Sequence, residues 1–461
     1  MGLRNVFNKK DKIEQPKDVP NLNRPMQNKF MLGIRYEFPK ENSEDVFVFG
    51  RLKGTVTVGD AVTISHFGED YAATQYSVIV AMRTADGQMP PTASNCDLTL
   101  LLQNAKNAQI KCGTVLFNGN VTTEGMHNAY LDALANVYIP HYNLNYKPED
   151  AEKLSLTDCQ EILRVYNVYS RPRQSQDPEI QRRNQEAETS FTNLFIRKLL
   201  SVKSIYCVYN KRTSEPHLFS RIVPQENEMY ICTEPYIMLI TKAFHERLAQ
   251  ISEDENLDIR EINNENNKNL EEFLSSTFYL NGACGAIINF QEVVLKAGML
   301  VTKPDFSEVP EINRPVMNPD LMRWILLIGQ LSSVDTDDGR FVFGLYYNLL
   351  SQELTKALLI TPVKYEGFVP EDETGKGIIK KGSEMQFPIL QGKYNRPAIK
   401  MYTDWKRLYE EEGNEWSGLI QPVESMISIY DCVINMSSNG DKGIYISKEM
   451  FEEIKRKSSD S

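Results

Sequence analysis

The 461-residue sequence lacks the short motifs that mark common catalytic sites. It contains no Gly-x-x-x-x-Gly-Lys-[Ser/Thr] segment, which excludes a P-loop phosphate site. It also contains no Gly-x-Ser-x-Gly nucleophile elbow and no Cys-x-x-Cys pair. The histidines are few, and they lack metal-ligand spacing: His66, His127, His141, His217 and His245. We therefore expect no catalytic residues, no bound metal and no cofactor.

Basic residues are outnumbered by acidic ones, and long apolar runs are scarce. Lys and Arg number 51 against 62 Asp and Glu, which gives a net charge of −11. This acidic balance opposes a general affinity for phosphate backbones. No run approaches the roughly 20 apolar residues that cross a bilayer, so we expect no membrane partner. The seven cysteines are scattered and odd in number, which favours reduced thiols and a cytoplasmic location.

The sequence does contain clear β-strand patterning near its start. Residues 1–24 are polar, and we expect them to form a flexible tail. From about residue 30 to residue 117, apolar residues recur with a period of two, as in DVFVFG, GTVTVGDAVTI and DLTLLLQN. The segment VGDA at 58–61 is typical of a tight turn. Short strands at this spacing predict an antiparallel β-barrel over residues 25–120.

This region resembles the second domain of the elongation factor Tu family. The segment GRLKGTVTVGDAV at 50–62 resembles the middle of that domain, in which a Gly-Arg turn is followed by a Gly, a strand and Gly-Asp. The segment IKCGTVL at 110–116 resembles its closing strands. The loop after the first strand reads IRYEFPKENSED, where the family has a Gly-Arg-Gly run. The resemblance implies a Tu-like barrel that serves recognition or spacing, because no GTPase accompanies it.

Two similar α/β domains are predicted after the barrel, one over residues 158–302 and one over residues 315–456. Residues 121–157 are predicted to be a connector with helical pieces. The first domain carries an excursion that the second lacks, SEDENLDIREINNENNK, and we expect it to be a solvated loop. The fold class is therefore multidomain, with an antiparallel β-barrel followed by two α/β domains.

The two α/β domains share short stretches of sequence. EPYIMLITKAFHERL and RPAIKMYTDWKRL both read as a strand followed by a helix start, and they align Thr241 with Thr403. Further along, Asn289 aligns with Asn435, each at the end of an apolar strand. This internal similarity predicts two copies of one fold, of which the first is eroded.

The second domain resembles the SseB family, named for enhanced serine sensitivity. Five motifs stand in the order of that family: Asn318-Pro319-Asp320-Leu321, Tyr346-Tyr347-Asn348-Leu349-Leu350, Phe387-Pro388-Ile389-Leu390, Tyr402-Thr403-Asp404 and Val433-Ile434-Asn435. The Pro that follows the last Asn in the family is Met436 here, and Lys242 replaces the Asp in the first domain. The resemblance implies tandem SseB-like domains behind the barrel.

Five polar residues near strand ends are the candidate interaction surface: Thr403, Asp404, Asn435, Thr241 and Asn289. A structural role is open for each of them as well. Thr403 or Asp404 can cap the helix that follows, since their side chains can accept hydrogen bonds from free backbone N–H groups. Asn289 and Asn435 can occupy left-handed turns, which asparagine tolerates.

The leading hypothesis is a bacterial, cytoplasmic, non-enzymatic scaffold that binds an unidentified protein partner through the barrel and the two SseB-like domains. A second hypothesis is an RNA- or ribosome-associated factor that acts through the barrel, although the acidic balance opposes nucleic acid. A third is an enzyme with a site between the two α/β domains. The sequence does not define an oligomeric state.

Overall fold

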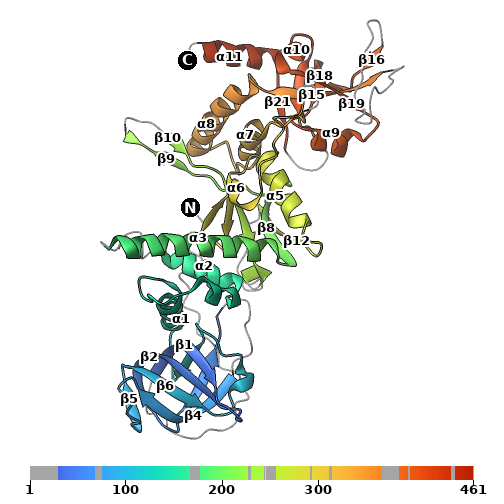
Figure 1. Ribbon diagram of the computed structural model, residues 1–461. Coiled ribbons are helices and arrows are strands. Elements are labelled where there is room, and N and C mark those ends of the chain that lie inside the picture. The colour runs from blue at the N-terminus through green and yellow to red at the C-terminus, as the bar shows by residue number, and fades with distance from the viewer. Residues whose placement is uncertain are drawn as a thin grey trace. The chain divides into compact units, whose positions relative to one another are not determined.

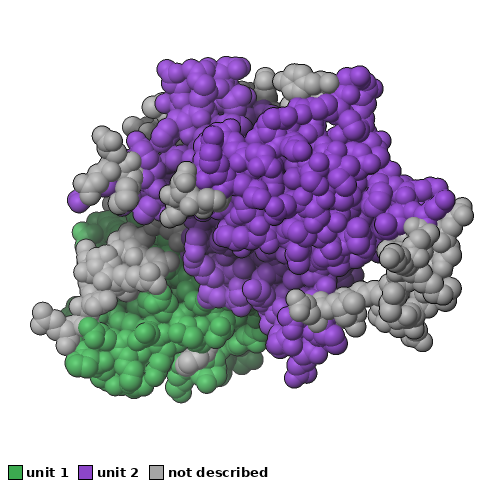
Figure 2. All heavy atoms as spheres, turned by 90° about the horizontal axis from the view of Figure 1, so that it is seen from above, with its two compact units in different colours: residues 1–201, 246–251 green, residues 202–245, 252–461 purple. Residues whose placement is uncertain are grey.

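Figure 1 shows a computed structural model of the chain. The structure describes residues 30–67, 75–166, 177–226, 230–242, 244–245, 256–290, 293–310, 314–365, 384–392, 395–437 and 442–459. The predicted tail at 1–24 lies outside the described residues. The chain divides into two compact units, coloured in Figure 2: unit 1 is Met1–Ser201 with Glu246–Ile251, and unit 2 is Val202–His245 with Ser252–Ser461.

Unit 1 begins with a closed antiparallel β-barrel, as the sequence predicts. Its strands are β1 (Phe30–Pro39), β2 (Val46–Thr57), β3 (Ala61–Ser65), β4 (Gln75–Thr84), β5 (Thr92–Ser94), β6 (Asp97–Leu102) and β7 (Val115–Asn118). The strand order is β1-β7-β3-β4-β6-β2, and a β1–β2 pairing closes the ring, with β5 added beside β2. The core of the barrel is mainly aliphatic, and in β3 and β6 every second residue is buried in it.

The turn predicted at 58–61 is confirmed, and its geometry shows why those residues occur there. Gly59 has a φ of 93°, in the left-handed region where glycine is free of strain. Asp60 closes the turn from both sides, because its N–H donates to the Thr57 carbonyl at 3.0 Å and its carboxylate accepts from the Thr57 N–H at 2.8 Å.

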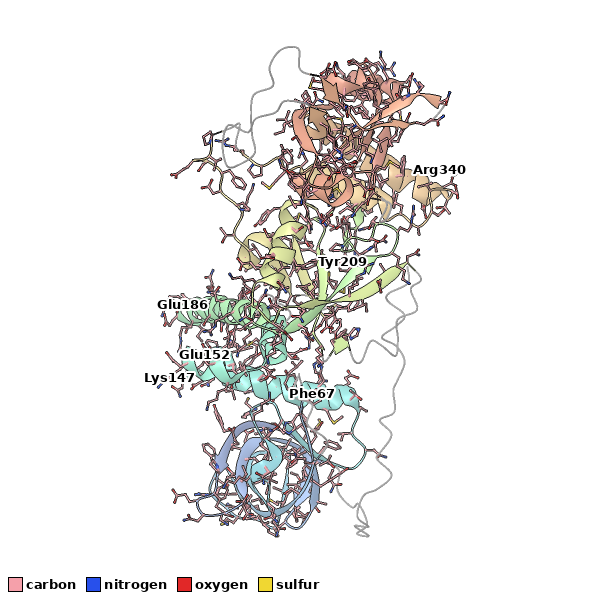
Figure 3. All side chains as sticks on the ribbon, turned by 90° about the vertical axis from the view of Figure 1, so that its right-hand side faces the viewer. Phe67, Lys147, Glu152, Glu186, Tyr209 and Arg340 are labelled. Atoms are coloured by element: carbon pink, nitrogen blue, oxygen red, sulfur yellow. The ribbon has the colours of Figure 1, made fainter. Side chains whose placement is uncertain are left out.

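Four helical elements follow the barrel in unit 1: α1 (Thr123–Tyr138), η3 (Pro148–Lys153), α2 (Leu156–Val165) and α3 (Pro178–Leu200). Each α-helix has a side-chain cap, from Thr122, from a Ser155–Asp158 capping box and from Asp177. Helix α1 packs on the barrel, where its Tyr130 ring stacks on Phe67 with centroids 5.1 Å apart. Figure 3 labels Phe67. Residues 121–157 are therefore part of a compact unit and do not form a separate connector.

A glycine sets how closely α1 approaches the barrel. A Cβ on Gly33 of β1 would lie 2.2 Å from the carbonyl oxygen of Ala129 in α1. That oxygen belongs to the helix backbone and cannot move aside alone. The absence of a side chain at Gly33 thus allows the helix to lie directly on the strand.

We predict that Gly33→Ala destabilises unit 1 by about 1–3 kcal/mol, because the added methyl group overpacks the contact between strand and helix. Chemical denaturation measures the change. Gly298→Ala is the matched control, because a Cβ there meets nothing within 4 Å. Equal stability of Gly33→Ala and the wild-type protein would contradict the close approach.

The first half of unit 2 is a mixed sheet with one covering helix pair. Its elements are β8 (Ser204–Asn210), β9 (Ile222–Pro224), β10 (Tyr230–Cys232), β11 (Ile237–Ile240), β12 (Leu257–Asn263), α5 (Asn269–Tyr279), β13 (Gly285–Ile288), β14 (Val294–Lys296) and α6 (Ala297–Leu300). The sheet order is β12-β8-β11-β13-β14, and β9 and β10 form a separate two-stranded sheet. Only the β11–β13 pair is parallel in the five-stranded sheet.

The second half of unit 2 has more helices. Its elements are α7 (Pro319–Gly329), α8 (Asp337–Leu354), β15 (Leu358–Tyr365), β16 (Met385–Gln386), β17 (Ile389–Gln391), β18 (Pro397–Met401), α9 (Trp405–Glu412), β19 (Ser417–Pro422), α10 (Val423–Ile427), β20 (Asp431–Ile434), β21 (Ile444–Ile446) and α11 (Lys448–Ser459). Strands β16-β15-β19 form one sheet and β17-β18-β20-β21 another, and an Ile360–Tyr402 bridge joins β15 to β18.

The two halves of unit 2 pair their strands in the same way. The antiparallel series β12-β8-β11 in the first half matches β19-β15-β18 in the second. The parallel pair β11–β13 matches β18–β20, and the antiparallel edge strand β14 matches β21. The strands predicted to be equivalent, β11 and β18, both hold the central position of this order.

Two details of the sequence analysis are corrected by the structure. The excursion expected to be a solvated loop contains β12, which pairs with β8 along its whole length. The unit boundary also differs from the predicted domain limits, because the chain divides at residues 201 and 202 and not at 157 and 158. Helices α2 and α3 pack together in unit 1, so they lie outside the compact unit that contains both α/β sheets.

Candidate functional site

Three of the five predicted residues meet where β18 and β20 end. These strands are parallel, so their carboxyl ends lie side by side. The Thr403 N–H donates to Asn435 Oδ1 at 2.9 Å, and Asn435 Nδ2 donates to Thr403 Oγ1 at 2.9 Å. Asn435 has a φ of 54°, which confirms the left-handed turn predicted for it.

Asp404 caps helix α9, as one interpretation of the sequence predicts. Its Oδ1 accepts from the Arg407 N–H at 3.0 Å, and its Oδ2 accepts from Thr403 Oγ1 at 2.8 Å. The same carboxylate also forms an ion pair with the Arg407 guanidinium. Asp404 therefore ties the strand end, the helix start and a buried arginine together.

The two predicted residues of the first half make an equivalent contact. The Thr241 N–H donates to Asn289 Oδ1 at 2.9 Å, and Asn289 Nδ2 donates to Thr241 Oγ1 at 3.1 Å. Asn289 has a φ of 53°, almost the value of Asn435. In each half the Thr–Asn pair therefore fastens the ends of the two parallel strands.

All five predicted residues lie in the interior. Thr403 is 0% exposed, Asp404 and Asn435 are 2% exposed, and Thr241 and Asn289 are 4% exposed. They therefore do not form an exposed interaction surface, because neighbouring side chains cover them. A role in recognition stays a prediction for these residues. Because they are buried, they would contribute to it by holding the strand ends in place and not by contacting the partner.

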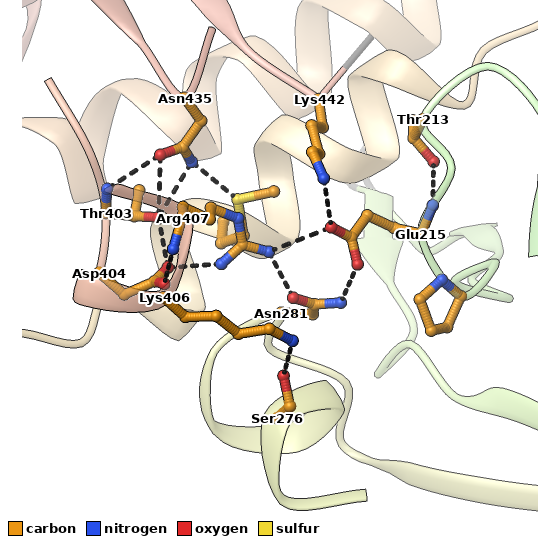
Figure 4. Close-up of polar contacts among 12 residues, drawn as sticks. Thr213, Glu215, Ser276, Asn281, Thr403, Asp404, Lys406, Arg407, Asn435 and Lys442 are labelled. Atoms are coloured by element: carbon orange, nitrogen blue, oxygen red, sulfur yellow. Dashed lines mark hydrogen bonds and ion pairs between the residues drawn. The ribbon is translucent and has the colours of Figure 1, made fainter. Parts of the chain in front are cut away.

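A larger polar network extends from Asp404 into the first half of unit 2 (Figure 4). Arg407 Nη2 donates to Asn281 Oδ1 and lies 3.6 Å from Glu215 Oε1. Asn281 Nδ2 donates to Glu215 Oε2 at 2.9 Å, and Lys442 Nζ donates to Glu215 Oε1 at 3.3 Å. Glu215 and Asn281 belong to the first half, whereas Arg407 and Lys442 belong to the second. The network thus joins the two halves.

The charges of this network balance in an interior position. The Arg407 side chain is 6% exposed and Asp404 is 2% exposed. Burial by itself lowers the pKa of Arg407, but the carboxylates of Asp404 and Glu215 outweigh that effect and raise it. The guanidinium is therefore charged and held by partners, as a buried cation must be.

The sequence analysis missed Arg407, Glu215, Asn281 and Lys442. The only local signal was the position of Arg407, three residues after a capping aspartate. Its partner Asn281 lies 126 residues away in the chain, and Lys442 lies 227 residues from Glu215. Such pairings depend on how the two halves of unit 2 meet, which one sequence does not reveal.

Other chemistry-bearing groups lie in structural positions. All seven cysteines are free, as the sequence predicts. Burial raises the pKa of Cys159 to about 12, so this thiol is protonated at neutral pH and is a poor nucleophile. Among the described residues, no three His, Cys, Asp or Glu side chains gather in a way that could hold a metal ion. Within the same residues, no helix has both the length and the hydropathy to span a bilayer.

The outer face of the barrel carries a group of aromatic side chains. Strand β2 alternates between buried and half-buried residues, so Phe47 and Phe49 point outward. In the register of β1 with β2, Tyr36 is opposite Phe49 and Phe38 is opposite Phe47. Phe38 is 55% exposed and Tyr36 is 39% exposed. We call Tyr36, Phe38, Phe47 and Phe49 the aromatic face.

Two arginines border the aromatic face. Arg51 follows Phe49 on the same side of β2 and lies 3.3 Å from the carboxylate of Asp97. Arg83 of β4 is level with Thr99 of β6, which is level with Phe49. Arg83 is exposed and forms no ion pair with any described residue. The face therefore combines apolar rings with two exposed cations, of which Arg51 has an ion-pair partner.

The similarity of this chain to known proteins is limited to part of its length. No family model matches the chain, and no curated protein matches it. Solved structures similar to the chain include translation elongation factor SelB from Methanococcus maripaludis, in its apo form and in complex with the GTP analogue GppNHp. Each comparison has 16% sequence identity and a TM-score of 0.18, and covers 21% of this chain. The chain spans 20% of the SelB chain. The closed barrel therefore rests on its own strand pairing.

Proposed function

We propose that this protein is a cytoplasmic, non-enzymatic scaffold that recognises a partner protein. The observation that supports this most is the aromatic face of the barrel. Tyr, Phe and Arg are enriched in protein interfaces, and exposed apolar patches commonly mark interaction sites. The four rings lie on two paired strands, so a partner would meet them as one rigid surface.

We also propose that the two halves of unit 2 are tandem SseB-like domains. The matching strand order and the matching Thr–Asn contacts support this. The network around Arg407 would then hold the two domains as a single body, on which a second recognition surface can be presented.

A second candidate function is binding of single-stranded RNA through the same barrel face. Bases stack on exposed aromatic rings, and the cations Arg51 of β2 and Arg83 of β4 would attract phosphates. The net charge of −11 opposes this alternative.

We predict that the double variant Phe38→Asp, Phe47→Asp loses most of its bound partner protein. Two carboxylates would replace two rings of the aromatic face and leave the barrel core unchanged, because both positions face outward. The measurement is quantitative mass spectrometry of proteins co-purified from the cytoplasm of the source organism.

The matched control for this prediction is Met89→Asp, another barrel position with an exposed side chain, at 71%. It should retain the partner. Equal partner recovery from the double variant and from the control would contradict the proposed function. RNA that co-purifies in a salt-sensitive way, and is lost in the double variant, would favour the second candidate.

A further inference from the structure

Strand β19, labelled in Figure 1, is an edge strand in the second half of unit 2. It pairs with β15 on one side, and no described strand pairs with its other side. Ile360 of β15 exchanges backbone hydrogen bonds with Tyr402, so its backbone groups point away from β19. Ile420 lies opposite Ile360, and its N–H and C=O groups therefore point to the open edge, as do those of Gly418 two residues earlier. No described residue bonds to them there.

The corresponding edge strand of the first half, β12, is protected against pairing. By the matching strand order, Arg260 of β12 is at the position of Leu419 in β19. Arg260 lies over the Tyr209 ring and forms an ion pair with Asp258 at 2.9 Å. Charged side chains on an edge strand oppose its pairing with another strand. β19 has no charged residue from Ser417 to Pro422, so it lacks this protection.

The edge formed by β19 is self-complementary about Leu419. If two β19 strands pair antiparallel with Leu419 at the centre, Gly418 lies opposite Ile420 of the second copy. On the same side of the sheet, Trp416 lies opposite Pro422 of the second copy. Each pair thus combines a larger side chain with a smaller one, and the 37% exposed Ile420 becomes covered.

The other side of the sheet matches as well. There Ser417 lies opposite Gln421 of the second copy, and Leu419 lies opposite its own equivalent. The carboxylate of Glu415, just before the strand, lies opposite Val423 and not opposite another acid. The pairing therefore places polar residues opposite polar ones and apolar residues opposite apolar ones, without opposing like charges.

We propose that β19 pairs antiparallel with β19 of a second copy of this chain, with a two-fold axis at Leu419. Gly418 and Ile420 then exchange backbone hydrogen bonds with Ile420 and Gly418 of the second copy. A second copy is favoured over an unrelated strand, because the sequence of β19 matches its own reverse at each pair. The same pairing of β12 would set Arg260 against Arg260, which opposes a contact through the first half. This contact goes beyond the proposed function and does not use the barrel.

The first test is the oligomeric state of the full chain. Sedimentation velocity should show monomers at low concentration and dimers at high concentration, because one strand pair buries little surface. Ile420→Pro removes the outward N–H and keeps the hydrogen bonds to β15, so it should weaken dimerisation by about tenfold. Glu261→Pro is the matched control, because Glu261 is at the position of Ile420 in β12. It should dimerise as the wild-type chain does.

Disulfide crosslinking locates the axis. Leu419 would face its own equivalent in a pair without backbone hydrogen bonds, where the two Cα atoms lie about 4.5 Å apart, within disulfide range. Leu419→Cys should therefore form a disulfide-linked dimer under mild oxidation. Arg260→Cys, at the equivalent position of β12, and the wild-type chain should not. Thermal unfolding checks that every variant is folded, and the crosslinking decides alone if Ile420→Pro is unfolded.

Several results would overturn the proposal. These are a monomer at every concentration, a dimer that folded Ile420→Pro leaves unchanged, and equal disulfide formation by Leu419→Cys and Arg260→Cys. Growth beyond the dimer would also overturn it, because a two-fold pairing of one edge is closed. Loss of the dimer in the Phe38→Asp, Phe47→Asp variant would place the contact on the barrel and would equally overturn it.

Discussion

Replacing Arg407 with Ala is expected to destabilise unit 2 by about 3–5 kcal/mol. The change leaves the buried carboxylate of Asp404 without its guanidinium and removes one donor to Asn281. It also removes one of the two cations that contact Glu215 and leaves only Lys442. An uncompensated buried charge costs far more than a lost surface pair, because neither water nor another donor replaces the partner.

Chemical denaturation followed by intrinsic fluorescence measures this effect. Arg340→Ala is the matched control, since Arg340 also pairs with an aspartate three residues away but is exposed. That control should cost less than about 1 kcal/mol. Adding Asp404→Asn to Arg407→Ala should recover part of the loss, because the orphaned charge disappears. Equal costs for Arg407→Ala and Arg340→Ala would show that the network does not stabilise unit 2.

Ile237→Ala and Ile399→Ala are each expected to cost about 2–5 kcal/mol. Both side chains are fully buried, and each lies on the strand that pairs in parallel within its half. Each truncation leaves a cavity beside a central strand. The close-packed neighbouring side chains can move only slightly, so they fill that cavity only in part. If the halves are tandem domains, the two costs should be similar.

The unfolding free energies of the two variants test this expectation. Ile231→Ala and Ile389→Ala are the controls, because these side chains are 54% and 46% exposed and should cost well under half as much. A large cost for Ile399→Ala with almost none for Ile237→Ala would restrict the SseB resemblance to the second half.

The sequence was most informative where local physics decides the structure. The period-two pattern of β2 and β6 arises because each of these strands has one face buried in the barrel core. The turn at Gly59 and the cap at Asp404 each depend on neighbours within a few residues. Such features can be read from one sequence.

Composition misled the analysis at β12. The segment is rich in Asn and acidic residues, which favours a loop, yet LDIREIN alternates and pairs with β8. A strand at a sheet edge tolerates charge on its exposed side, so polarity alone did not exclude it. The period-two alternation of residues 257–263 indicates a strand, which their composition does not.

The sequence did not reveal how deeply the candidate residues are buried. Thr403 and Asn435 look like surface residues at strand ends, but both are buried, and their hydrogen bonds to each other satisfy polar groups that water cannot reach. The aromatic face was also missed. Tyr36 becomes level with Phe49 only through a register shift between Ile34 and Tyr36, which depends on the pairing of β1 with β2.

Site-specific photo-crosslinking from the barrel tests the central claim most directly. A benzoylphenylalanine at position 38 would sit in the aromatic face, and one at position 89 would sit at another exposed barrel position. Irradiation of a native cell extract should give a discrete adduct at position 38 that protease digests and ribonuclease leaves intact, with no such adduct at position 89. An adduct that ribonuclease removes, or the same adducts from both positions, would contradict recognition of a partner protein by this face.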